Sequence, residues 1–154
     1  MTAEVARAVL ASAVDHLPDG LRAGQGWPTR DTVDGVRLSW DVPGREQDGQ
    51  PAGGSRLVVV RETREVVGDL GWKGGPGPDG VVEIGYGLAA PSRGRGYGTE
   101  AVRAFVDWAL GPGGAGTLTA EVLADNMPSR RLLERLGFTV DRVHGAAVWY
   151  ASSR

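Results

Sequence analysis

Several short segments of the chain alternate apolar and polar residues, which is the pattern of a strand with one buried face. The clearest is residues 81–88, where Val82, Ile84 and Tyr86 fall on the same face. The other segments have the same alternation or a short apolar run between turn residues. The predicted strands are residues 56–61, 65–72, 81–88, 117–123, 138–143 and 146–151.

The second face of the strand at 81–88 is unusual for a buried strand. It carries Glu83 beside two residues without side chains, Gly85 and Gly87. Glycines there leave space where a strand normally packs side chains, and such a space can admit a ligand. A bulge or a close approach of neighbouring backbone explains the glycines equally well.

Other segments place apolar residues three and four positions apart, which predicts helices with one buried side. In residues 126–136, Asn126 suits the N-cap and Gly137 suits the position after the last turn. The predicted helices are residues 2–14, 30–40, 99–110 and 126–136, and the predicted Gly/Pro-rich loops are 43–54, 74–80 and 111–116. Strands, then alternating helices and strands, indicate a mixed α/β sheet.

Composition narrows the class of protein. The 154 residues suit one domain, and a chain of this length buries about 68–70% of its unfolded surface. Without Cys there is no disulfide or thiol nucleophile, and His16 and His144 alone make no metal site. A net charge of −2 gives no basic surface for nucleic acid, and no apolar run approaches the about 20 residues of a membrane helix. With no signal peptide evident, we expect a cytoplasmic protein without a membrane partner.

Candidate chemistry is concentrated in the segment RGRGYGT, between a predicted strand and a predicted helix. Its glycines allow positive φ angles and a close approach to a ligand. A glycine-rich turn that enters a helix directs unpaired N–H groups and the positive end of the helix dipole at one point, which favours phosphate or pyrophosphate. The segment comprises Arg93, Gly94, Arg95, Gly96, Tyr97, Gly98 and Thr99.

Two common phosphate-binding motifs do not fit. A Walker loop requires Gly-Lys-Ser/Thr, whereas the single lysine of the chain, Lys73, lies elsewhere. A dinucleotide fingerprint requires G-x-G-x-x-G in an early βαβ unit, whereas these glycines give G-x-G-x-G after some 90 residues.

Four features in this order resemble the core of a GCN5-related N-acetyltransferase. They are the segment VVEIGYGL, the segment RGRGYGT, a helix that begins at an Asn, and the tripeptide LGF. The branch that it most resembles contains the ribosomal-protein N-terminal acetyltransferases. The resemblance is strongest over 81–140 and weak over 1–55. It implies an α/β (α+β) fold: one domain over 1–154, with a mixed, largely antiparallel sheet, flanking helices and diverging central strands.

The resemblance also implies an acetyl-CoA site. In the family, backbone groups at the end of the strand, here Tyr86, Gly87 and Leu88, hold the pantetheine and polarise the thioester carbonyl. The loop amides from Gly94 to Thr99 would take the pyrophosphate, and Asn126 would face the pantetheine. Charge at the rim would come from Arg93 and Arg95.

Acyl transfer to an amine requires a general base, because a lysine-like amine has a pKa of about 10.4 and an α-amine about 7.7–8.0. Glu83 and Glu121 are the candidates, and Glu83 is favoured because it shares a face with the two strand glycines. Either could instead be a solvated or Arg-paired carboxylate. Many relatives donate a proton to the thiolate from a Tyr at the position of Leu133, so Ser129 is the candidate acid here. It could also be a plain first-turn residue.

The resemblance leaves the acceptor open. No strand is predicted before Arg56, although relatives begin with one, and this region normally shapes the acceptor pocket. Trp27, Trp40 and Trp72 are candidate lining residues, although core packing is the more common role of such side chains. The expected activity is transfer of an acetyl group to a primary amine, on a peptide N-terminus or a small molecule, in a ternary complex. Two alternatives stay open: the donor could be a larger acyl-CoA, or the protein could be a non-catalytic CoA-binding sensor. A homodimer also stays open.

Overall fold

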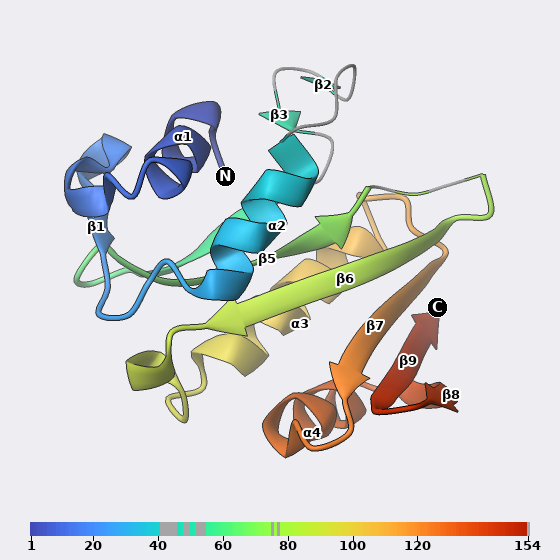
Figure 1. Ribbon diagram of the computed structural model, residues 1–154. Coiled ribbons are helices and arrows are strands. Elements are labelled where there is room, and N and C mark those ends of the chain that lie inside the picture. The colour runs from blue at the N-terminus through green and yellow to red at the C-terminus, as the bar shows by residue number, and fades with distance from the viewer. Residues whose placement is uncertain (41–45, 48–49, 52–54, 75, 77, 154) are drawn as a thin grey trace.

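The structure of the chain is a computed structural model, and it describes residues 1–40, 46–47, 50–51, 55–74, 76 and 78–153. Helices and strands alternate along it much as the sequence pattern predicts (Figure 1). The α-helices are α1 (Ala3–Leu10), α2 (Arg30–Trp40), α3 (Tyr97–Ala109) and α4 (Met127–Arg135). The strands are β1 (Arg22–Ala23), β2 (Glu46–Gln47), β3 (Gln50–Pro51), β4 (Arg56–Val60), β5 (Glu65–Lys73), β6 (Val81–Leu88), β7 (Thr117–Leu123), β8 (Thr139–His144) and β9 (Ala147–Ser153).

A seven-stranded sheet is the centre of the molecule. Its strands follow the order β1-β5-β6-β7-β9-β8, and β4 also pairs with β5. Only the β1–β5 and β6–β7 pairs are parallel, and the other pairs in this sheet are antiparallel. The expected mixed, largely antiparallel sheet is confirmed.

The two central strands β6 and β7 pair over only three positions and then separate. The last paired position joins Glu83 to Thr119, although β6 continues to Leu88 and β7 to Leu123. The Thr119 hydroxyl donates to the Val82 carbonyl at 3.4 Å, beside this last pair. The sheet therefore has a fork, defined here as the point after Glu83 and Thr119 where β6 and β7 diverge. Divergence of the central strands was expected and is confirmed.

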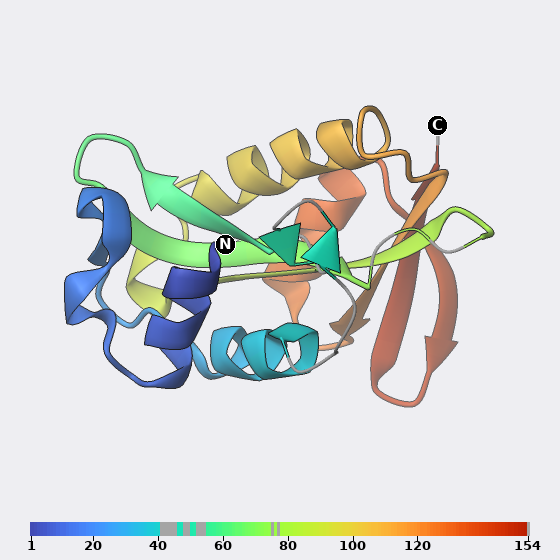
Figure 2. The same ribbon diagram turned by 90° about the horizontal axis from the view of Figure 1, so that it is seen from above.

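Hydrophobic clusters stabilise both faces of the sheet. The larger cluster contains the predicted stripe of α3, the inner residues of α4 and one face of β6 and β7. The smaller cluster packs α1 and α2 against β5. Figure 2 shows α3 on one side of the central strands and α1 and α2 on the other. The apolar face of β6 and β7 lies in the larger cluster, which holds both strands against α3 and α4 after they separate.

The N-terminal region departs most from the predictions. The structure has short strands before Arg56, β1 and the β2–β3 pair, where the sequence pattern predicted none. Strands of two residues are too short to show alternation, so pattern analysis misses them. Within the predicted loop 43–54, residues 43–45, 48–49 and 52–54 lie outside the described residues. In the loop 74–80 the same holds for 75 and 77.

No helix within the described part of the chain is both long enough and apolar enough to cross a membrane.

Candidate active site

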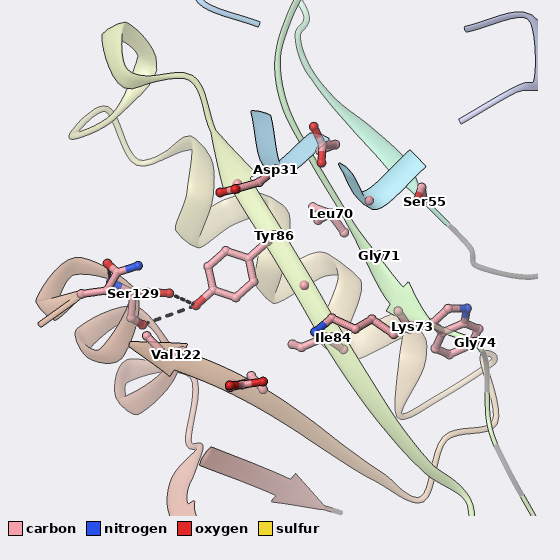
Figure 3. A pocket seen from close by; sticks show the side chains of 18 of the residues that line it. Asp31, Ser55, Leu70, Gly71, Lys73, Gly74, Ile84, Tyr86, Val122 and Ser129 are labelled. Atoms are coloured by element: carbon pink, nitrogen blue, oxygen red, sulfur yellow. Dashed lines mark hydrogen bonds between the residues drawn. The ribbon is translucent and has the colours of Figure 1, made fainter. Parts of the chain in front are cut away.

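The fork opens into a cavity of about 950 Å³. Its walls come from α2 and β5 on one side, β6 in the middle, and β7 with the start of α4 on the other (Figure 3). Several residues predicted from the sequence meet there: Gly85, Tyr86, Gly87, Glu121, Asn126 and Ser129. These residues are up to 44 positions apart in the chain, and the divergence of two strands brings them together.

The glycine face of β6 is open, as the ligand interpretation of the sequence requires. A Cβ placed on Gly87 would meet no atom within 4 Å, and one on Gly85 would meet only Lys73 Cε, at 3.9 Å. Close packing therefore does not explain these two glycines. The close-packed glycine is Gly68 of β5, where a Cβ would lie 2.3 Å from the Gly87 carbonyl oxygen.

The glycine-rich loop follows β6 and ends in the first turn of α3. Gly94 and Gly96 have φ of 75° and 88°, and a Cβ on either would meet no atom within 4 Å. Gly96 is the N-cap of α3, so the amides of Tyr97, Gly98 and Thr99 have no acceptor within the helix. The loop thus presents free donors at a helix N-terminus, where the dipole favours an anion.

Two details of this loop differ from the sequence interpretation. Glycine allows positive φ at all three positions, but Gly98 has helical geometry, and a Cβ there would lie 3.3 Å from Leu88 Cδ1 and 3.5 Å from Leu132 Cδ1. Gly98 thus permits close packing of α3 on β6. The Arg93 Nε donates to the Leu88 carbonyl at 3.0 Å, so its side chain also binds the strand end. Arg95 is exposed.

The two candidate carboxylates have different surroundings. Glu83 lies directly opposite Lys73 on β5, and the Lys73 ammonium donates to its Oε1. Its side chain is only 24% exposed. Glu121 is two residues beyond the last β6–β7 pair, so it lies on the cavity wall at the open side of the fork. It is exposed and forms no ion pair with any described residue.

Ser129 and Asn126 lie at the start of α4. The Asn126 Oδ1 accepts the Ser129 amide at 3.3 Å and so caps the helix, as expected. The Ser129 Oγ lies 2.6 Å from the hydroxyl of Tyr86, which reaches α4 from β6 (Figure 3). Burial raises the pKa of Tyr86, and its hydrogen bond with Ser129 opposes that change. Leu133, where many relatives have Tyr, is fully buried.

Asp69 is a lining residue that sequence reasoning missed. Its Oδ2 accepts Trp27 Nε1 at 3.1 Å and Thr32 Oγ1 at 2.5 Å, which connects the start of α2 to β5. Burial raises the pKa of the Asp69 carboxyl, and the two hydrogen bonds partly oppose that change. The sequence signal that could have identified Asp69 was a carboxylate within an otherwise apolar strand. Of the three candidate tryptophans, Trp72 lines the cavity and Trp27 is buried. The side chain of Trp40 lies outside the described part.

A model of the acetyltransferase (GNAT) domain family matches residues 12–139. The chain belongs to this family. The match extends well upstream of 81–140, where the resemblance is strongest, and includes most of the N-terminal region. The fork between β6 and β7 and the glycine-rich loop before α3 therefore lie within a GNAT domain.

Similar proteins include other acetyltransferases. The chain is 29% identical over 122 residues to the uncharacterized N-acetyltransferase YjdG of Bacillus subtilis, covering 79% of this chain and 72% of that protein. An acetyltransferase of Agrobacterium tumefaciens superposes with a TM-score of 0.62 at 26% identity, covering 83% of this chain and 74% of the other. RimL, a ribosomal L7/L12 alpha-N-protein acetyltransferase in complex with coenzyme A, gives 0.55 at 19% identity, covering 59% and 57%.

Among the described residues, no group of three or more His, Asp or Glu side chains is placed so that it could hold a metal ion.

Proposed function

We propose that the chain transfers an acetyl group from acetyl-CoA to a primary amine, by direct transfer in a ternary complex. The observation that carries the proposal is the continuity of the fork with the glycine-rich loop at the end of β6. From Leu88 back to Glu83 the strand covers about 17 Å at the usual rise of about 3.4 Å per residue. One extended ligand can therefore place an anionic group at the loop and a reactive end at the fork.

Acetyl-CoA would bind mainly to the protein backbone. The amides between Gly94 and Thr99 would hold the pyrophosphate, since they are free and lie at the positive end of α3. Beyond Glu83, no strand in the described part of the chain pairs with the edge of β6 that faces β7. Its backbone groups at Tyr86, Gly87 and Leu88 are proposed to pair with the pantetheine and to polarise the thioester carbonyl, with Asn126 nearby.

We assign the general base for an incoming amine to Glu121. The support is its exposure on the cavity wall and its lack of an ion-pair partner in the described chain. Glu83 was favoured on sequence grounds, but its carboxylate binds Lys73. In the reaction the amine attacks the carbonyl carbon, the C–N bond forms and the C–S bond breaks, while the amine proton passes to Glu121 directly or through water.

We assign the proton donor for the departing thiolate to Ser129. The support is that its hydroxyl lines the cavity and is hydrogen-bonded to Tyr86. A thiol with a pKa near 8.5 is also a fair leaving group without help. The contribution of Ser129 is therefore expected to be smaller than that of the base.

The test is release of free CoA thiol with a panel of primary amines, which includes peptides and small molecules. Thiol release that requires an amine, with E121Q lowering turnover about 100-fold or more near neutral pH and leaving acetyl-CoA binding intact, supports the proposal. Amines lose their proton more readily at high pH, so the deficit of E121Q should shrink as pH rises. Binding of acetyl-CoA without turnover with any amine would instead identify a non-catalytic CoA-binding module. A larger acyl-CoA used in preference would correct the donor.

A further inference from the structure

Lys73, the single lysine of the chain, projects into the candidate active site. It is the last residue of β5 and lies directly opposite Glu83 on β6. Figure 3 shows its side chain extended from β5 across β6. The side chain reaches the Gly85 end of the open glycine face, because its Cε lies 3.9 Å from the Cβ position of Gly85.

The position of the lysine amine coincides with the fork. Glu83 is the last residue of β6 that pairs with β7, and the Lys73 ammonium donates to the Glu83 carboxylate. Between Lys73 and Glu83 the side chain passes Gly85, which is next to Tyr86, where the thioester carbonyl of the donor is proposed to bind. The side chain is 62% exposed, so the amine is not enclosed by packing and can change its rotamer.

These contacts assemble the three parts of an amine-acetylation site within one chain. The amine is Lys73 Nζ, the proton acceptor is Glu83, and the slot for the acyl donor passes the glycine face beside them. Holding a nucleophile next to the reacting carbon replaces a bimolecular encounter by an intramolecular one, which is a large kinetic advantage.

We propose that Lys73 is a site of self-acetylation, an inference that rests on the proposed function. One proton of the ammonium passes to Glu83 and then to solvent, and the neutral Nζ attacks the thioester carbonyl carbon. A C–N bond forms and the C–S bond breaks, so that CoA leaves as a thiolate. The nitrogen loses its second proton as the amide forms, and the thiolate takes up that proton. The products are Nε-acetyl-Lys73 and free CoA.

Acetylation of Lys73 would change the acceptor end of the cavity. The lysine would lose its positive charge, and the ion pair with Glu83 would be lost with it. Glu83 would become a free carboxylate on the same face of the sheet as Glu121, which lies two residues beyond Thr119, the β7 partner of Glu83. The self-acetylated chain is therefore expected to favour cationic acceptors more than the unmodified chain does.

The experiment is incubation of the purified full chain with acetyl-CoA alone, followed by intact-mass measurement and peptide mapping. We expect the mass of one acetyl group on the peptide that contains residue 73, with CoA released in equal amount. The rate per molecule should not change with protein concentration, because the transfer is intramolecular. Peptide mapping separates this product from acetylation of the α-amino group of Met1.

Matched variants distinguish enzymatic from chemical acetylation. K73R keeps a cation opposite Glu83 but has no amine that can be deprotonated, so it should gain no acetyl group at position 73. E83Q keeps the lysine and removes its proton acceptor, and it should slow the modification about tenfold or more. Chemical acetylation would proceed equally in E83Q and in urea-unfolded protein.

Each outcome separates this proposal from the proposed function. Amine-dependent CoA release without acetyl-Lys73 overturns self-acetylation and keeps the transferase. Absence of both, in a chain that binds acetyl-CoA, overturns the transferase itself. Modification at the same rate in the folded chain, E83Q and the unfolded chain overturns self-acetylation, as does a rate proportional to protein concentration.

Discussion

The two ends of the acetyl-CoA site proposed along β6 are formed by different kinds of group. At the loop end, the candidate donors are backbone amides at Gly96 and in the first turn of α3, and side chains have a minor part. At the fork end, the candidate groups are side chains from separate elements, with Lys73 on Glu83 and Tyr86 on Ser129. The loop end is thus contiguous in sequence, whereas the fork end is assembled across strands and a helix.

This difference makes the two ends sensitive to different changes. A backbone site tolerates most side-chain substitutions but is sensitive to a Cβ where the chain has positive φ. A side-chain site depends on register and on hydrogen-bond partners that can be replaced one at a time. Substitutions at the loop end should therefore abolish binding of the donor, whereas those at the fork end should leave binding and reduce the rate.

The largest effect is expected from Gly96→Val. A β-branched residue at a φ of 88° is strained, and its side chain would occupy the open space in front of the free amides. We expect acetyl-CoA binding to weaken by about 100-fold or more, which corresponds to about 2.7 kcal/mol. Isothermal titration calorimetry measures the change.

A strained control is available in Gly145→Val, in the turn between β8 and β9. Gly145 also has positive φ, 57°, and a Cβ there would meet no atom within 4 Å. This variant carries comparable backbone strain away from the proposed acetyl-CoA site. It should therefore bind acetyl-CoA as the wild-type chain does. Equal weakening in both variants, or normal binding in G96V, contradicts the assignment of the loop.

An intermediate effect is expected from the hydroxyl pair at the fork end. S129A should lower kcat about tenfold, because the thiolate can leave without an enzymic acid, with KM for acetyl-CoA little changed. Y86F removes the hydroxyl that is hydrogen-bonded to Ser129 Oγ and should lower kcat less. If Tyr86 acts through Ser129, the double variant loses no more than S129A alone, and steady-state kinetics of all four proteins measures the coupling. Additive losses contradict the shared role.

The smallest effect is expected on stability, at the brace between α2 and β5. Asp69→Ala leaves Trp27 Nε1 without its acceptor, which costs about 1–3 kcal/mol, whereas the Thr32 hydroxyl can still donate to Thr29 Oγ1, 2.9 Å away. Each kcal/mol lowers Tm by about 2–4 °C for a chain of this size. Acetyl-CoA binding at the loop end should be unaffected, and thermal unfolding with a binding titration measures both.

Asp69→Asn separates the charge from the hydrogen bonds, since an amide oxygen can still accept both donors. The folded pKa of Asp69 is raised above its ordinary value of 3.8, so the folded state binds this proton more tightly than the unfolded state. The free energy of unfolding of the wild-type chain, relative to that of D69N, should therefore fall as pH rises from 3.8 to the raised pKa of Asp69. A gain of stability over that window contradicts the assigned cause.

The outcome of sequence analysis differed along the chain for a physical reason. Residues 81–137 carry long periodic elements, and β6, α3, β7 and α4 all appear close to their predicted bounds. The short strands β1, β2 and β3 have two residues each and no period to detect. In the glycine-rich loop, Gly94 and Gly96 adopt the positive φ that glycine allows, whereas Gly98 is helical and packs near Leu132, a contact that depends on a distant helix.

The sequence by itself determined that a glycine-rich turn enters a helix after a strand with a bare face, because these features are local and depend on the absence of Cβ atoms. With the family resemblance, it also limited the candidate base to Glu83 and Glu121, each on the face of its strand opposite the main apolar row. Only the tertiary structure decided which carboxylate is free, because the partner of Glu83 is set by the β5–β6 register that brings Lys73 opposite it. Cross-strand partners are fixed by pairing across the sheet, which local pattern does not encode.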